Sequence, residues 1–208
     1  MANDYRAVSV DQASFNAALA ALSALGASDG VVAKVASRSI NRALPTARLA
    51  ASKEIGAEVT CKATTIKGAM KYDKATVRKL QGALVARGRK LNLIHFQAKQ
   101  TKEGVTARVY KKGERELYKH AYIHKTQKGN FLVMERTAYK GPRKPWNPQR
   151  AYGKMPKEYR LPIGPKIADI GIPHMLAKSE IMNPTLKAGG DALVKNANRE
   201  MNYELGKL

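Results

Sequence analysis

The side chains that could bind a metal ion are few in this 208-residue chain and are poorly spaced for the purpose. Its histidines are His95, His120, His124 and His174. His120 and His124 stand four residues apart, which would bring both imidazoles to one face of a helix. The surrounding residues indicate a strand instead, in which four residues span roughly 13 Å. We therefore expect no metal site, and we expect these histidines to be partly exposed polar residues of a sheet.

The candidate nucleophile is Cys61, the only cysteine, so a disulfide or a cysteine zinc site within one chain is excluded. Lys62 stands beside it and could lower the thiol pKa, but no base is positioned to activate it. The chain has no G-x-S-x-G motif. We expect a small thiol that is buried or partly buried.

Acidic residues are also poorly placed for catalysis. The centre of the chain offers only Asp73, Glu103, Glu114, Glu116, Glu135 and Glu158. They are scattered among basic residues, whereas a Mg²⁺-dependent nuclease needs clustered acids. Both common phosphate-binding motifs, G-x-x-x-x-G-K-[ST] and G-x-G-x-x-G, are absent. The sequence therefore predicts a protein that is not an enzyme and has no cofactor.

Positive charge is concentrated in the middle of the chain. The formal net charge is +22, and residues 62–166 hold 27 basic and 6 acidic residues, a net of +21. The remaining residues hold 11 basic and 10 acidic residues. Such a field favours acidic partners such as nucleic acid, an anionic membrane or an acidic protein face. The central segment is therefore the expected binding surface.

Basic side chains within that segment occur in two settings. Some stand in turns between expected strands, and others are interleaved with aromatic residues in a proline-rich arm over residues 138–160. The candidate contacts to DNA or a partner are Arg87, Arg89, Lys90, Lys111, Lys112, Arg143, Lys144 and Arg150. The candidate assembly contacts are Tyr139, Trp146, Tyr152 and Tyr159. This mixture could bind single-stranded nucleic acid, but we favour protein–protein contact, in which Tyr, Trp and Arg contribute most of the energy. A turn that is merely solvated is the plain alternative for the basic turns.

The elements that must position these residues are helical at both ends. Hydrophobic residues make up 44% of the chain, enough for a core. Residues 11–25 predict an amphipathic helix, and a second stripe runs through Val32, Val35, Ala36, Ile40, Ala43, Ala47 and Ala50 or Ala51. Because Pro45 lies inside that stripe, we expect two helical pieces, near 29–43 and 45–58. A short helix over 64–70 follows.

The middle of the chain predicts strands. Val105, Ala107 and Val109 alternate with polar residues, residues 75–87 and 118–125 are further candidates, and Gly129-Asn130 makes a turn before a strand over 131–136. We expect an antiparallel meander with one basic face. Beyond the arm, the final helix is predicted to begin near Asn183-Pro184. Its expected stripe is Leu186, Gly190, Leu193, Ala197, Met201 and Leu205.

Together these patterns predict an α+β fold: a small antiparallel sheet packed with N-terminal helices and a long C-terminal helix, plus the extended arm. We treat residues 1–208 as a single domain. Its expected parts are a helical part (1–70), a basic sheet part (71–137), the arm (138–171) and a C-terminal helical part (172–208). No signal peptide or membrane span is recognised, so we expect folding in a reducing cytoplasm and no membrane partner.

The order of these features resembles one known family. The features that carry the resemblance are, in order, Ser39-Ile40-Asn41-Arg42-Ala43, Leu93-Ile94-His95-Phe96, Gly104-Val105, and residues 129–136 (GNFLVMER). The order ends with Tyr159-Arg160-Leu161-Pro162-Ile163, Gly164-Pro165, Ile172-Pro173 and a terminal helix. This order is similar to that of the minor tail protein Z family of lambda-type tailed phages and prophages, over residues 30–205. Pro45 and the arm depart from the plainer family pattern.

The resemblance implies a structural virion protein that completes the head-proximal end of the tail. It implies a ring of six copies, help in tail-to-head joining and in placing the DNA end, and a flexible, non-contractile tail. The implied partners are the tail terminator, the head–tail connector and genomic DNA passing through the channel. The implied location is the virion, after assembly in the host cytoplasm. The alternative is a basic nucleic-acid-binding protein that acts outside a particle, and a nuclease is disfavoured by the scattered acids.

Overall fold

The computed structural model describes residues 5–7, 20, 28–88, 90–136 and 163–206. The chain divides into two compact units: a helical unit (1–90 and 169–208) and a β unit (91–168). Helices and antiparallel sheets both occur, so the predicted α+β class is confirmed. Within the described residues, the β structure forms three three-stranded sheets, whereas the sequence predicts one small sheet. The predicted helix over 11–25 lies, apart from Ala20, outside the described residues.

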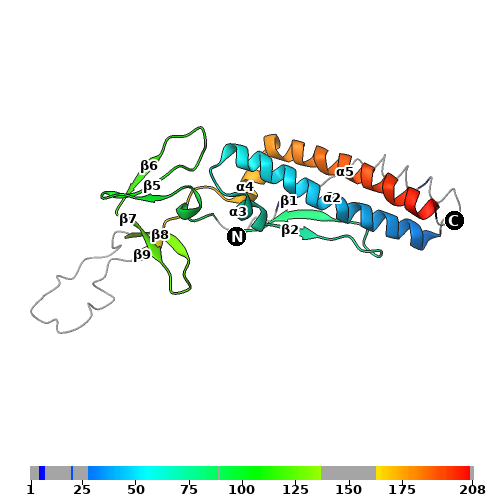
Figure 1. Ribbon diagram of the computed structural model, residues 1–208, viewed down its shortest axis with the longest axis horizontal. Helices are drawn as coiled ribbons and strands as arrows, with labels where there is room; N and C mark the ends of the chain where they lie inside the picture. Colours follow the sequence, from blue (N-terminus) through cyan, green and yellow to red (C-terminus); the bar gives the residue numbers. More distant parts are fainter. Residues whose placement is uncertain (1–4, 8–19, 21–27, 89, 137–162, 207–208) are drawn as a thin grey trace, which may run out of the picture. The chain divides into compact units, whose positions relative to one another are not determined.

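The helical unit is built on two long helices, α2 (Asp29–Glu58) and α5 (Ser179–Leu205), which lie side by side (Figure 1). They run antiparallel, because Arg38 pairs with Glu204 at 3.2 Å and Glu58, at the other end of α2, pairs with Lys178 at 2.8 Å. The predicted stripe of α2 is confirmed by the burial of Val35, Ala36, Ile40, Ala43, Ala47 and Ala51. Burial of this stripe makes α2 and α5 one packed pair.

The predicted break at Pro45 is wrong, because α2 is continuous from Asp29 to Glu58. Pro45 is exposed, so its ring faces away from the buried stripe. The side chain of Asn41, one turn earlier, exchanges two hydrogen bonds with the backbone of Ala75, at 2.8 and 2.9 Å. Burial of the flanking Leu44 and Ala47 offsets the cost of a mid-helix proline, which is about 3 kcal/mol.

The predicted start of the last helix is also corrected. Helix α5 begins at Ser179, and Pro184 lies inside it. Ile181, in the first turn of α5, is buried, and this burial stabilises the helical conformation before Pro184. Thr185 Oγ1 donates to the Ile181 carbonyl at 2.7 Å. The buried face runs through Ile181, Thr185, Gly189, Leu193, Ala197 and Glu200. Leu193 and Ala197 confirm part of the predicted stripe, whereas Leu186, Gly190, Met201 and Leu205 are only partly buried.

Shorter elements complete the helical unit. They are α3 (Ala63–Gly68), α4 (Ile172–Leu176) and a sheet of order β1-β3-β2, formed by Tyr5–Ala7, Ala83–Ala86 and Met70–Asp73. The predicted strand over 75–87 is found only in its last part, after Gly82. A Cβ at Gly82 would lie 2.5 Å from Ile40 Cγ2, so this glycine permits the close approach to α2. Strands β2 and β3 therefore belong with the helices and not with the sheet part predicted for 71–137.

The β unit holds two sheets. The first has the order β4-β5-β6, formed by Lys99–Gln100, Gly104–Ala107 and Glu116–Lys119. The second has the order β7-β8-β9, formed by Ala121–Lys125, Phe131–Arg136 and Ile163–Pro165. The strand predicted over 131–136 has the predicted bounds, and Gly129 makes the expected turn with a φ of 83°. A short 3-10 helix, η1 (Leu93–His95), precedes the strands.

One predicted strand, over 118–125, is divided. His120 has a φ of 63°, so the chain turns there and passes from β6 into β7 of the other sheet. Histidine is among the residues that tolerate this left-handed backbone. The core of the β unit is small and includes Leu93, Phe96, Val105, Ala107, Ala121, Val133 and Ala168. Side-chain bonds support it: Asn92 Oδ1 accepts from the Val133 amide at 2.9 Å, and Asn92 Nδ2 donates to the Val133 carbonyl at 3.0 Å.

Candidate interaction surface of the β unit

The structure divides the predicted basic contacts between the two units. Arg87 and Lys90 belong to the helical unit, where Lys90 forms an ion pair with Asp169. Lys111 and Lys112 are exposed in the loop that joins β5 to β6. These two pairs therefore do not form one cluster within either unit. Arg89, Arg143, Lys144, Arg150 and all four predicted aromatic contacts (Tyr139, Trp146, Tyr152 and Tyr159) lie outside the described residues.

Sequence reasoning missed a basic face on the β4-β5-β6 sheet. The strand register pairs Lys99 with Thr106 and Thr106 with Leu117, so these three side chains point to one side. Lys119 stands on the same side, two residues after Leu117. The opposite side carries Val105 and Ala107, both fully buried. We call Lys99, Thr106, Arg115, Leu117 and Lys119 the basic sheet face. The alternation of Arg115, Leu117 and Lys119 with Glu116 and Tyr118 was the sequence signal for it.

Arg115 is held against this sheet by backbone acceptors. Its Nη1 donates to the carbonyls of Gln97 at 2.8 Å and of Thr106 at 3.3 Å, so the side chain reaches from the start of β6 across β5. Lys99, Arg115 and Lys119 are all exposed, and Leu117 is 39% exposed. The arrangement therefore presents three cations on an open sheet, with one guanidinium fixed in place before any ligand arrives.

Gly104 keeps two strands of this sheet close together. It has a φ of 155° and pairs with Lys119, and a Cβ at this position would lie 2.2 Å from the Tyr118 carbonyl oxygen. The Gly104 carbonyl accepts from the Thr101 amide at 2.7 Å, from Thr101 Oγ1 at 3.0 Å and from Gln100 Nε2 at 3.0 Å. Gln100 Oε1 in turn accepts from the Ile123 amide at 2.8 Å. The turn between β4 and β5 is thereby tied to β7.

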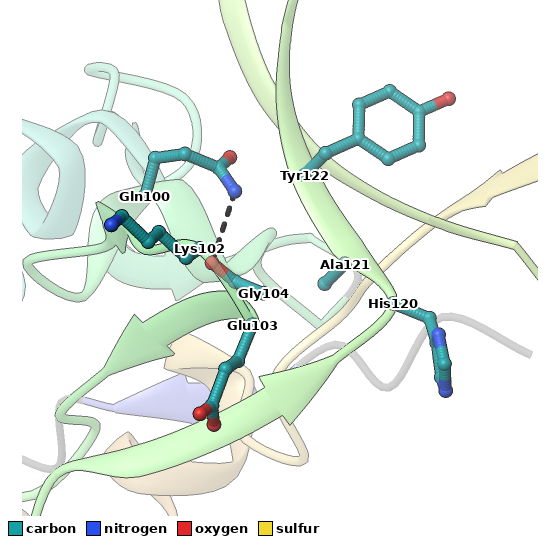
Figure 2. A pocket seen from close by; sticks show the side chains of 7 residues that line it. All are labelled: Gln100, Lys102, Glu103, Gly104, His120, Ala121 and Tyr122. Carbon is teal, nitrogen blue, oxygen red and sulfur yellow. Dashed lines mark hydrogen bonds between the residues drawn. The ribbon is translucent and has the colours of Figure 1, made fainter.

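A shallow pocket of about 410 Å³ lies between this turn and the start of β7. It is lined by Gln100, Lys102, Glu103, Gly104, His120, Ala121 and Tyr122. Figure 2 shows Glu103, His120 and Tyr122 pointing in different directions, while Gln100 folds back onto Gly104. The pocket thus presents separate polar groups with no converging acid–base set. We regard it as an indentation beside the basic sheet face.

The remaining chemistry-bearing residues have structural surroundings. Cys61 is buried, as predicted, and burial raises the pKa of its thiol, which disfavours the reactive thiolate. His120 and His124 are exposed on the β unit. Across the described ranges, no group of three His, Cys, Asp or Glu residues is placed to hold a metal ion. Among the described helices, none is long and apolar enough to span a membrane.

The residues on either side of positions 137–162, which include the predicted arm over 138–160, meet in the β7-β8-β9 sheet. β9 (Ile163–Pro165) lies within the wider arm part predicted for 138–171. The last residue of β8, Arg136, pairs directly with the first residue of β9, Ile163. The two residues that flank positions 137–162 therefore lie at paired backbone positions of neighbouring strands. β8, which ends at Arg136, is the central strand of this sheet, and β9, which begins at Ile163, is an edge strand.

Comparison of the chain with protein-family models, with curated proteins and with solved structures found no significant match in any of the three.

Proposed function

We propose that this chain is a structural, non-enzymatic phage virion protein that completes the head-proximal end of a tail. In this role it assembles as a ring of six copies, helps tail-to-head joining and helps position the DNA end. The observation that carries the proposal is the pairing of Arg136 with Ile163. It brings together the two residues that flank the segment richest in interleaved basic and aromatic residues, which supports the contact-arm interpretation.

The physical reason is entropic. A segment whose ends are fixed side by side loses less freedom on binding than a free tail of equal length. Tyr and Trp in such a segment supply contact area, and Arg supplies charge. The α2–α5 pair adds support, because a paired helical scaffold suits a subunit that must keep its shape within a ring.

The decisive experiment separates the arm's aromatic residues from its charges. One variant changes Tyr139, Trp146, Tyr152 and Tyr159 to Ser, and the matched variant changes Arg143, Lys144 and Arg150 to Gln. Each is added to extracts that contain heads and tails but lack this chain, and joined particles are counted by electron microscopy. We expect the aromatic variant to lose joining and the charge variant to retain more of it. Normal joining after deletion of residues 138–160 would overturn the arm's role.

The second candidate, a nucleic-acid-binding protein that acts outside a particle, is favoured by the basic sheet face. Mass measurement in solution distinguishes the two. A ring of six corresponds to six times the 22.8 kDa chain, either alone or on tail ends. A chain that remains monomeric, has no affinity for tails and binds DNA tightly would favour the second candidate.

A further inference from the structure

We propose that the basic sheet face, centred on Lys99, Arg115 and Lys119, binds the phosphate backbone of duplex DNA without reading its sequence. This inference deepens the proposed function, on which it rests for its biological setting, by assigning the DNA contact to named residues. It differs from the sequence-based prediction, which placed DNA contacts in the arm and in the basic turns.

Charge complementarity is the first support. The face carries three exposed cations around Thr106, and Gly104 contributes no side chain in the adjoining row. The described part of the β unit includes Glu103, Glu114, Glu116 and Glu135 as its acids. Of these, Glu135 is paired with Lys166 at 2.7 Å, and Glu116 is paired with Ala107 in the strand register, so it lies on the side of the sheet opposite Thr106 and Leu117. Glu103 and Glu114 are exposed in the turns, outside the strands of the face. The local field at the face is therefore positive and open to a polyanion.

The dimensions of the sheet fit a duplex. Two strand spacings separate β4 from β6, which makes the face about 10 Å wide. A duplex of that length carries roughly six phosphate charges, so each of the three cations has a phosphate within reach. The bonds of Arg115 to the Gln97 and Thr106 carbonyls fix its guanidinium in advance, which lowers the entropy lost on binding.

The composition favours duplex backbone over the other polyanions. Among the described residues of this face there is no aromatic ring, so unstacked bases of a single strand would find no stacking platform there. Its one large apolar side chain is Leu117, at 39% exposure. The core of a protein–protein interface is usually apolar and depleted in Lys. A face of two lysines and an arginine on a polar sheet resembles a backbone-binding surface instead.

The test is the salt dependence of binding to a short duplex of arbitrary sequence. The variant Lys99→Gln/Lys119→Gln removes two charges from the face. The matched control Lys125→Gln/Lys128→Gln removes two exposed charges from the β7–β8 hairpin. We expect the first variant to lower the slope of log affinity against log salt by about 1.8 and to weaken binding roughly 10- to 100-fold at about 0.1 M salt. The control should change affinity by less than about threefold, because exposed charges elsewhere are screened.

Three further measurements serve as controls. Lys99→Arg/Lys119→Arg keeps the charges and should retain the slope, and thermal unfolding of each variant checks that the β unit remains folded. Wild-type protein should bind duplex more tightly than a single strand of the same length. Equal losses in the face variant and its control would overturn the inference, since diffuse charge would then explain binding. Tighter binding to the single strand would overturn it as well.

Failure here and failure of the proposed function are distinguishable. Unchanged DNA binding together with lost tail joining in Lys99→Gln/Lys119→Gln would show that the face meets an acidic protein, so the inference would fall while the tail role stood. If the variant loses DNA binding, and the wild-type protein neither assembles into a ring nor joins tails, the inference would be supported and the tail role would be removed.

Discussion

The two units of this chain differ in how far acidic residues balance their basic ones: the helical unit holds 20 basic and 11 acidic residues, and the β unit holds 18 basic and 5 acidic residues. In the helical unit, Arg38, Arg42 and Lys178 form ion pairs with Glu200, Glu204 and Glu58, between α2 and the α4–α5 segment. The helical unit also exposes cations, such as Lys34, Lys53 and Lys187. In the described part of the β unit, the exposed basic residues are Lys99, Lys102, Lys111, Lys112, Arg115, Lys119, Lys125 and Lys128. Cations that pair internally stabilise a fold, whereas cations left on a surface repel one another until a partner neutralises them. The helical unit is therefore suited to be the scaffold, and the β unit to be the binding surface.

The units also differ in what holds them together. The largest fully buried side chains are Ile55, Ile66, Met70, Leu84, Ile172, Met175, Leu176, Ile181 and Leu193 in the helical unit, but only Leu93 and Phe96 in the described part of the β unit. With so little apolar burial, the β unit depends on tight turns and on side-chain bonds from Gln100 and Asn92. It should open more readily than the helical unit. Disturbing one turn in it should cost more than disturbing one contact between helices.

The largest effect is expected from Gly104→Ala. The new methyl group would meet the Tyr118 carbonyl oxygen at 2.2 Å, and backbone cannot move aside as a flexible side chain can. We expect a loss of about 3 kcal/mol in the free energy of unfolding of the β unit. Hydrogen exchange read peptide by peptide should show faster opening of residues 91–136 and little change in α2 and α5. The control Gly164→Ala meets nothing within 4 Å and should be nearly neutral.

Glu200 tests the internal pairing of the helical unit. Its side chain is 5% exposed, and it accepts from Arg42 and lies 3.7 Å from Arg38 Nη1. Because both arginines are 49% exposed, they can regain water when the carboxylate is removed. We therefore expect Glu200→Ala to cost about 2 kcal/mol, less than the 3–5 kcal/mol typical of a broken buried pair. Chemical denaturation followed by helical circular dichroism measures this. Glu180→Gln, at an exposed position, should change little.

Substitutions at two adjacent glycines of α5 should change the stability of the helical unit in opposite directions. A Cβ at Gly189 would lie 3.3 Å from Ala47 Cβ, whereas Gly190 has nothing within 4 Å. Gly190→Ala should stabilise the helical unit by about 1 kcal/mol through helix propensity. Gly189→Val should destabilise it by about 1–2 kcal/mol, because the larger side chain separates the helices. Thermal unfolding of both variants provides the comparison, and stabilisation by Gly189→Val would contradict the close α2–α5 packing.

These glycines illustrate how far sequence reasoning reaches. Periodicity predicted the α2 stripe and the bounds of β8, because one buried face dominates each of those patterns. It placed Gly190 in the buried stripe of the last helix, whereas the buried glycine is Gly189, which lies against Ala47. Pro45 was misread for a related reason: the exposed position of its ring is a tertiary fact.

The candidate site was harder to predict than the fold. Lys99 belongs to a strand of two residues, too short to show alternation, and the register that places it beside Thr106 and Leu117 depends on the turn around Gly104. Arg87 and Lys90 resembled Lys111 and Lys112 as basic turns, yet the fold assigns the two pairs to different units. Charge composition therefore located the binding region, whereas strand register was needed to choose the residues.

The smallest expected effect is a pH dependence confined to the β unit. Burial lowers the pKa of His95, which stands at the end of η1 next to the buried Phe96. A histidine with a lowered pKa in the folded state contributes stability above its unfolded pKa of about 6.5, and that contribution is lost as the pH falls. Hydrogen exchange at pH 7 and pH 5, corrected for the intrinsic exchange rate, should show the β unit opening more readily at pH 5. The variant His95→Gln should lose that difference, and an unchanged pH dependence in it would assign the effect to another group.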